Sequence, residues 1–281
     1  MDFTGKTAVI TGAGRGLGLV YAQELARRGA NVVISDSGAD TSGAGTDTAV
    51  VTQAARRLES EGFKVFGHAG DLSTERGCGE LVEATVNAFG QLDILIHNAG
   101  WVGYQAIEET DTSFLGRALD INVYAPIWLC KHAWKHLKHS PAARVVLTSS
   151  DRAMYQRYAQ PGLTAYAAGK MAQLGIMNAL SMEGAACGIL VNTVSPVAKT
   201  RMWGVDGEPQ NLKPEWVAPG VIFLASAHCQ DTGYILRASN GQFTATRFTE
   251  GPQVDYPVDL ARVKAASAEQ VAERWRHIKE R

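Results

Sequence analysis

The sequence lacks the features that mark membrane proteins, secreted proteins and nucleic-acid-binding proteins. No apolar run in its 281 residues approaches the roughly 20 residues that a transmembrane helix needs. The N-terminus, MDFTGK, has neither the basic nor the apolar region of a signal peptide. The formal net charge is only -1, which argues against nucleic acid or an acidic membrane as the main partner. We therefore expect a small-molecule partner.

Cysteine is scarce, and its spacing excludes two further kinds of site. Cys78, Cys130, Cys187 and Cys229 have neither the spacing of metal ligands nor that of a disulfide framework. We expect reduced thiols, no metal and a cytoplasmic location. The C-terminal Lys-Glu-Arg is also not a peroxisomal address.

Short apolar strands alternate with amphipathic helical patterns along the chain. Strands are expected at Lys6–Thr11, Asn31–Ser35, Lys64–Gly67, Leu92–Ile96, Arg144–Thr148, Ile189–Val194 and Tyr234–Ala238. This alternation predicts an α/β fold with one doubly wound parallel sheet. No repeat or linker divides the chain. We expect one domain over residues 1–250, with a C-terminal extension, residues 251–281, packed on that domain or on a neighbouring subunit.

A glycine cluster follows the first strand directly. Thr11, Gly12, Gly16 and Gly18 form the pattern Thr-Gly-x-x-x-Gly-x-Gly, and a helix is expected from Leu17 to Arg28. Backbone amides at the start of a helix can approach a pyrophosphate only where side chains are absent. The strand, turn and helix order therefore predicts a phosphate-binding loop.

Asp36 follows the second strand, where an acid would hold a ribose hydroxyl and repel the extra phosphate of NADP. Arg15 in the glycine loop would favour a phosphate instead. We expect NAD over NADP because the carboxylate would lie closest to the ribose. The following segment, Ser37–Asp47, is small and polar, and we expect a mobile surface loop.

Tyr166 and Lys170 lie four residues apart in a helical segment, so their side chains should share one face. An ammonium near a phenol favours the phenolate, which would make Tyr166 a proton shuttle near neutral pH. Ser149 and Ser150 end a buried strand, a common place for catalytic groups. His97 also ends a strand, but no second histidine lies near it in sequence, so we expect it to be packed.

A long helical pattern, Asp111–Leu137, carries Asn122 in its interior and Pro126 as a possible kink. Asparagine is unfavourable inside a helix, which hints at a functional role.

Taken together, these motifs resemble the short-chain dehydrogenase/reductase family over about residues 4 to 241. The resemblance rests on the glycine pattern, Asn98-Ala99-Gly100, Asn122, Ser150 and Tyr166-x-x-x-Lys170. Within the family, MDFTGKTAVITGAG, LKPEWVAP and the extended C-terminus look most like the (3R)-hydroxyacyl-CoA dehydrogenase part of multifunctional β-oxidation enzymes. Those enzymes use NAD, and some relatives act on 17β-hydroxysteroids. The resemblance implies a Rossmann-type sheet.

The resemblance also implies roles for individual residues. Tyr166 would exchange the proton of the alcohol, and Lys170 would lower the Tyr166 pKa and hold the nicotinamide ribose. Ser150 would bind the substrate oxygen, and Asn122 would position a water in a proton relay. The implied cofactor site consists of Gly12, Arg15, Gly16, Leu17, Gly18, Asp36, Asp71, Leu72, Asn98, Ala99, Gly100, Tyr166, Lys170, Pro196 and Thr200.

Three positions depart from the family pattern. His97 stands where Asn is common, and Val197 stands where many members have Gly. The loop before Tyr166 is longer than usual, so the family's spacing lands on Ala153, which has no hydroxyl. Because loops absorb insertions more readily than sheets, we assign the substrate hydrogen bond to Ser150, with Ser149 as the rival.

These observations predict an NAD(H)-dependent enzyme that interconverts a secondary alcohol and a ketone on a bulky apolar substrate, such as a hydroxyacyl-CoA or a steroid. The alternatives are a non-catalytic nucleotide-binding regulator and an NADPH-dependent reductase of small ketones. A small-residue side of the helix after Lys170 predicts a homodimer or homotetramer. Side chains expected near the substrate are Trp101, Tyr104, Arg152, Met154, Tyr155, Arg157, Tyr158, Met202 and Trp203.

Overall fold

A computed structural model describes residues 1–200 and 212–279. Strands of this part of the chain form one eight-stranded sheet in the order β3-β2-β1-β4-β5-β6-β7-β8. All pairs are parallel except β7 with β8. The strands are β1 (Thr7–Thr11), β2 (Asn31–Ser35), β3 (Val65–His68), β4 (Ile94–Ile96), β5 (Arg144–Thr148), β6 (Leu190–Val197), β7 (Ile235–Ser239) and β8 (Gln242–Thr246). The predicted doubly wound fold is confirmed.

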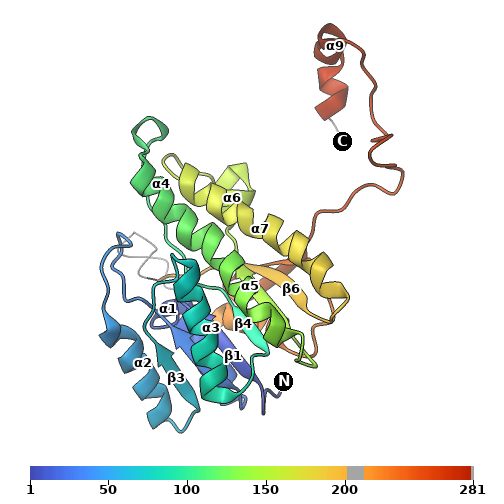
Figure 1. Ribbon diagram of the computed structural model, residues 1–281. Helices are drawn as coiled ribbons and strands as arrows, with labels where there is room; N and C mark the ends of the chain where they lie inside the picture. Colours follow the sequence, from blue (N-terminus) through green and yellow to red (C-terminus); the bar gives the residue numbers. More distant parts are fainter. Residues whose placement is uncertain (201–211, 280–281) are drawn as a thin grey trace. The chain divides into compact units, whose positions relative to one another are not determined.

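Helices cover both faces of this sheet (Figure 1). Alternate strand residues point to opposite faces, so Ile10 joins one apolar layer and Val9 the other. The Ile10 layer includes residues of α1 (Gly16–Arg27), α2 (Thr48–Ser60) and α8 (Ala218–Ala225). The Val9 layer includes residues of α3 (Glu75–Phe89), α5 (Ala125–Leu137) and α7 (Thr164–Ala185). Burial on both faces explains why the strands read as continuous apolar runs.

The helix expected over Asp111–Leu137 is interrupted, so that prediction is corrected. Its first part is α4 (Thr112–Leu119), capped by the Asp111 carboxylate, which accepts a hydrogen bond from the amide of Phe114 at 2.8 Å. A π-helical turn, Asp120–Tyr124, then leads into α5. The irregularity lies at this turn. Pro126 lies in the first turn of α5, directly after the π-turn.

The strand expected to be the last is followed by another. Asn240 and Gly241 have φ of 51° and 72°, as a two-residue hairpin turn requires. They connect β7 to β8, whose residues are all exposed. An Asn-Gly pair between two strands is a signal for such a hairpin, and it is present in the sequence.

The chain divides into two compact units, Met1–Thr246 and Arg247–Arg281. The described part of the second unit includes the helix α9 (Ala268–Lys279) and a cis peptide bond before Pro257. Within residues 1–200 and 212–279, no helix has both the length and the apolar character needed to cross a bilayer.

Candidate active site

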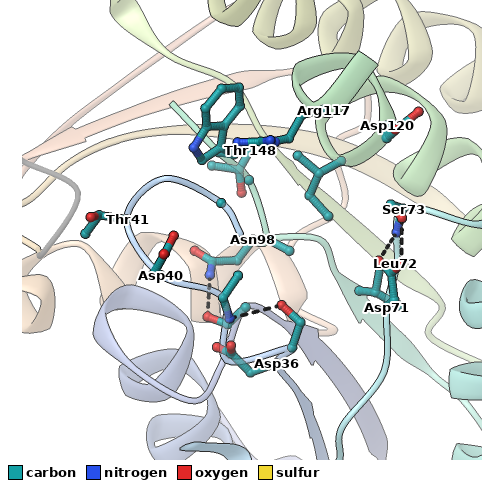
Figure 2. Close-up of a pocket in the computed structure, with 18 of the residues that line it drawn as sticks. Asp36, Asp40, Thr41, Asp71, Leu72, Ser73, Asn98, Arg117, Asp120 and Thr148 are labelled. Carbon is teal, nitrogen blue, oxygen red and sulfur yellow. Dashed lines mark hydrogen bonds between the residues drawn. The ribbon is translucent and has the colours of Figure 1, made fainter. Parts of the chain in front are cut away.

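A cleft of about 900 Å³ opens at the carboxyl edge of the parallel sheet, and Figure 2 shows residues that line it. The strand order reverses between β1 and β4, whose carboxyl ends carry the glycine loop and the His97–Gly100 segment. Ligands of doubly wound sheets bind at such a reversal. The fold therefore directs attention to this cleft.

Glycine is required in the loop after β1. Gly12 and Gly16 have φ of 61° and 57°, which favour glycine. A Cβ on Gly12 would lie 2.8 Å from the Cα of Ala99, and a Cβ on Gly18 would lie 2.3 Å from the Gly12 carbonyl oxygen. Side chains at these positions would push the loop away from the segment that follows β4.

The start of α1 suits an anion. No side chain caps this helix, its first turn has no acidic residue, and Gly16 and Leu17 line the cleft. The first amides of a helix lack intrahelical acceptors and lie at the positive end of its dipole. The pyrophosphate of a dinucleotide therefore fits this end of the cleft.

Asp36 lies beside the glycine loop in a fixed position. Its carboxylate accepts hydrogen bonds from the amides of Gly14 at 3.0 Å and Gly38 at 2.8 Å. The exposed Arg15 donates from Nη2 to the carbonyl of Ala39 at 3.2 Å. Two backbone amides thus hold the carboxylate, and one backbone carbonyl holds the guanidinium.

Thr11 and Asn98 join the ends of β1 and β4. The Thr11 Oγ1 accepts from the amides of Asn98 at 3.1 Å and Ala99 at 3.0 Å. In return, the Asn98 Nδ2 donates to the carbonyls of Thr11 at 3.1 Å and Gly12 at 3.0 Å. These four bonds fix the glycine loop against the Asn-Ala-Gly segment.

Asn122 lies buried in the π-turn. Its Nδ2 donates to the carbonyls of Ala118 at 2.9 Å and Trp101 at 3.1 Å, whereas its buried Oδ1 has no partner in the described part of the chain. A Cβ on Gly100 would lie 3.0 Å from this Oδ1 and 3.0 Å from the Lys170 Nζ. An unsatisfied acceptor beside an amine is a suitable place for a water or a ligand hydroxyl.

Lys170 is a buried amine, 4% exposed, on α7. Its Nζ donates to the carbonyl of Thr148 at 3.0 Å and lies 6.0 Å from the centroid of the Tyr166 ring, so the predicted common face is confirmed. Burial lowers the pKa of Lys170 to about 8, because a charged amine is costly away from water.

The expectation that Lys170 draws Tyr166 toward the phenolate is wrong for this structure. Burial raises the pKa of Tyr166 above its ordinary value, and the groups that oppose this rise are the Ser150 hydrogen bond and the positive charge of Arg152. The amine of Lys170 is itself desolvated, and its proton is directed to a backbone carbonyl. Tyr166 therefore holds its proton at neutral pH.

The two serines after β5 differ in their partners. The Ser149 hydroxyl is buried and donates to the backbone carbonyl of Lys170 at 2.8 Å. Ser150 begins the short helix α6 (Asp151–Met154), accepting from the amide of Arg152 at 3.2 Å, and it hydrogen-bonds to Tyr166. The structure thus places the Ser150 hydroxyl, and not that of Ser149, beside the phenol.

Sequence reasoning missed the residues that anchor α6. The carboxylate of Asp151 accepts from the Arg237 Nε at 3.1 Å and Nη2 at 2.7 Å, and from the Ser195 Oγ at 2.8 Å. These contacts hold the helix that begins with Ser150 against β6 and β7. Arg237 is 86 residues from Asp151 in the chain, and no local pattern indicates such a pair.

The expected surface loop Ser37–Asp47 also has an unpredicted role. Arg117 on α4 donates from Nη1 to the carbonyl of Ser42 at 2.7 Å and lies over the Trp101 ring, 5.3 Å from its centroid. A Cβ on Gly43 would lie 2.7 Å from the Trp101 Cδ1. The loop residues Asp40 and Thr41 line the cleft, so this loop folds over it (Figure 2).

The cleft brings together most of the predicted residues. Those that line it are Gly12, Arg15, Gly16, Leu17, Asp36, Asp71, Leu72, Asn98, Ala99, Gly100, Tyr166, Lys170, Pro196 and Thr200. Gly18, Asn122 and Ser150 lie outside this lining, although Ser149 is part of it. Of the side chains expected near the substrate, Trp101 lines the cleft, while Met202 and Trp203 lie outside the described residues.

His97, where the family commonly has Asn, is fully buried and makes a hydrogen bond through each ring nitrogen. The prediction of a packed histidine is confirmed.

Comparison with known proteins decides the family. The model of the short chain dehydrogenase family matches residues 6–210. This chain belongs to the short-chain dehydrogenase/reductase family. A short-chain type dehydrogenase/reductase of Mycobacterium tuberculosis is 29% identical over 97% of this chain and 93% of its own. The peroxisomal multifunctional enzyme type 2 of Drosophila melanogaster is 32% identical over 94% of this chain, which spans only 45% of that enzyme.

A solved family member supports the same assignment. The 3-ketoacyl-(acyl-carrier-protein) reductase of Brucella melitensis, complexed with NADH, superposes with a TM-score of 0.75 at 29% identity. The match covers 85% of this chain and 99% of the reductase. The chain is therefore a short-chain dehydrogenase/reductase, an oxidoreductase family that acts on CH–OH groups with nicotinamide cofactors.

Proposed function

We propose that this short-chain dehydrogenase/reductase interconverts a secondary alcohol and a ketone with NAD(H). The proposal rests on one observation, that a single cleft combines a nucleotide-binding end with a catalytic end. Its nucleotide end has the uncapped start of α1 and the Asp36 carboxylate, and its other end has Tyr166 and Lys170. A purely nucleotide-binding regulator would need only the first of these ends.

The preference for NAD rests on Asp36. Two backbone amides hold its carboxylate at the wall of the cleft, where a ribose hydroxyl can donate to it. A phosphate on that ribose would meet a negative charge. Arg15 gives one donor to the Ala39 carbonyl, on the loop side of the cleft. These contacts favour NAD over the NADPH-dependent alternative.

Tyr166 carries the proton chemistry. In ketone reduction the neutral phenol donates its proton to the substrate oxygen as a general acid, and in alcohol oxidation the phenolate accepts the proton of the alcohol as a general base. Ser150, hydrogen-bonded to Tyr166, holds the same oxygen. Lys170 supplies a buried amine for the nicotinamide ribose, and Asn122 offers its Oδ1 to a relaying water. When bound, the cofactor supplies the hydride exchange with the carbinol carbon.

The substrate proposed is bulky and apolar, such as a hydroxyacyl-CoA or a steroid. The likeness to the multifunctional enzymes supports the acyl-CoA, and aromatic side chains near the site support the apolar character. Trp101 packs edge-on against Phe114, and Tyr155 against Tyr158. Arg152, next to the site, donates to the Tyr104 hydroxyl at 2.8 Å and so fixes that ring. In the proposed complex its positive charge also faces a phosphate of the acyl-CoA.

The purified protein should be screened against secondary alcohols, hydroxysteroids and hydroxyacyl-CoAs while NADH absorbance is followed. Turnover should appear with NAD, and Tyr166→Phe should lower kcat by about 10²–10⁴-fold, the usual share of general acid–base catalysis. NADH binding to this variant, measured by fluorescence titration, should stay close to wild type. Tight NADH binding without any turnover in the wild type would instead indicate the regulator.

A further inference from the structure

The π-turn leaves one backbone carbonyl without a donor from its own helix. In an α-helix the amide of Ala125 would donate to the carbonyl of Ile121, four residues earlier. Here the Ala125 amide donates to the carbonyl of Asp120 instead. The π-helical donor for Ile121 would be the amide of residue 126, five residues on, but this residue is proline and has no N–H.

His97 satisfies this carbonyl from outside the helix. Its Nε2 lies 3.1 Å from the Ile121 carbonyl oxygen, and the side chain is fully buried at the end of β4. A buried carbonyl without a partner costs roughly 1–3 kcal/mol, so the contact matters for the shape of the turn. Asparagine, common here in the family, has a shorter side chain.

The hydrogen bonds around Thr11 define which nitrogen of His97 carries the proton. The Thr11 Oγ1 already accepts from the amides of Asn98 and Ala99, so its single hydrogen points to the His97 Nδ1 at 3.1 Å. The proton of the neutral imidazole is therefore on Nε2, facing Ile121. Burial lowers the pKa of His97 to about 3, and this arrangement persists at all physiological pH values.

The next residue after Ile121 is Asn122. Its Nδ2 hydrogen bonds reach Ala118 on one side and Trp101 on the other, and its unpaired Oδ1 lies beside Lys170. Any relaxation of the turn toward an ordinary α-helix would rotate this side chain away from Lys170. The orientation of Asn122 thus depends on keeping the Ile121 carbonyl where it is.

We propose that His97 is a positioning residue for Asn122, and that it compensates for the donor which Pro126 removes from the π-turn. Through Thr11, the same hydrogen bonds connect the turn to the glycine loop at the nucleotide end of the cleft. This inference deepens the proposed function and rests on it for its kinetic consequences.

The test compares His97→Leu, which has no polar atom, with His97→Gln, whose amide offers one donor and one acceptor. His97→Leu should lower kcat by about 10²-fold, the usual cost of misplacing a group near the chemistry by about 1 Å. His97→Gln should recover much of this loss. Asn192→Leu is the matched control, because it removes the hydrogen bonds of a buried side chain, to Cys229, Asp231 and Tyr234, outside the lining of the cleft. It should lower stability and leave kcat unchanged.

Two double variants separate positioning from general stability. In an Asn122→Ala background, His97→Leu should change kcat by less than about two-fold, since residues that act through one another are not additive. Pro126→Ala restores an amide that can donate to Ile121, so His97→Leu with Pro126→Ala should be more active than His97→Leu alone. The proposal is overturned if the kcat losses of His97→Leu and Asn122→Ala are additive. It is also overturned if His97→Leu leaves kcat unchanged, or if Pro126→Ala does not raise the kcat of His97→Leu.

Hydrogen–deuterium exchange gives a readout that needs no substrate. Amides of residues 118–128 should exchange faster in His97→Leu than in the wild type, and more slowly again once Pro126→Ala is added. If the wild type shows no turnover but this pattern appears, the proposed function fails while the structural role of His97 stands. Unchanged exchange in His97→Leu would refute that role, whether or not the protein is an enzyme.

Discussion

The two serines after β5 allow a sharp test, because their hydroxyls serve different partners only one residue apart. Ser149→Ala removes a donor to the Lys170 carbonyl, and Ser150→Ala removes the cap of α6 together with the hydroxyl beside Tyr166. We expect both variants to fold and to lose similar stability. Only Ser150→Ala should lose catalysis.

The magnitudes follow from these contacts. Loss of the Ser149 hydrogen bond costs about 1 kcal/mol, and loss of a helix cap such as Ser150 also costs about 1 kcal/mol. For a domain of this size each change should lower Tm by about 2–4 °C. Removal of a hydrogen bond to the reacting oxygen typically lowers kcat by about 10²–10³-fold. Stability therefore cannot distinguish the two variants, whereas kcat can.

The assay is NADH formation under saturating alcohol and NAD, with Tm measured on the same samples. Ser150→Thr is the control, since it keeps a hydroxyl that can cap α6 and reach the substrate oxygen. It should retain most of the wild-type kcat. A greater kcat loss in Ser149→Ala than in Ser150→Ala would mean that the assignment is wrong by one residue.

Three further predictions concern the cofactor, the buried amine and the assembly. The wild type should have a higher kcat/KM with NAD than with NADP, and Asp36→Ala should lower the ratio of these two values. A wild-type preference for NADP would show that the charge of Arg15 outweighs that of Asp36. Burial lowers the pKa of Lys170 to about 8 from an unfolded value of 10.5, so the unfolded state binds its proton more tightly and stability rises with pH between these values. From pH 7 to 9.5 the free energy of unfolding by urea should therefore rise by about 2 kcal/mol more in the wild type than in Lys170→Met, and equal slopes would contradict the assigned burial. Light scattering at micromolar concentration should show a dimer or tetramer, because Ala168, Gly175 and Ala179 leave an exposed small-residue side on α7; a monomer alone would refute this.

Local patterns were sufficient for most of the fold. The seven parallel strands were predicted near their observed positions, because apolar runs bounded by glycine and polar residues are strong signals. The π-turn was not predicted, because its sequence keeps the apolar spacing of a continuous helix. The hairpin strand β8 was not predicted, although the Asn240-Gly241 pair indicates a hairpin turn at this point.

In the site, too, features that depend on residues close in sequence could be predicted, and features that depend on distant segments could not. Tyr166 and Lys170 could be placed on one face from their spacing alone. The raised pKa of Tyr166 could not be predicted, because it results from the burial of the phenol, which the spacing of Tyr166 and Lys170 does not indicate. The pairs Asp151–Arg237 and His97–Ile121 join segments that meet only in the folded chain, so no spacing rule reveals them.

The π-turn also determines which residues of α5 face the sheet. Each residue of an α-helix advances the chain by about 100°, so a turn with one extra residue offsets the faces of α4 and α5 by roughly that angle. This offset lets α4 pack on α7 while the apolar side of α5, with Leu129, Ala133 and Leu137, faces α3 and the sheet. A substitution within residues 120–124 alters one side chain. Deletion of one residue there would instead let the turn close into an ordinary α-helical turn, which would keep the apolar side of α5 in its layer but move Asn122 away from Lys170.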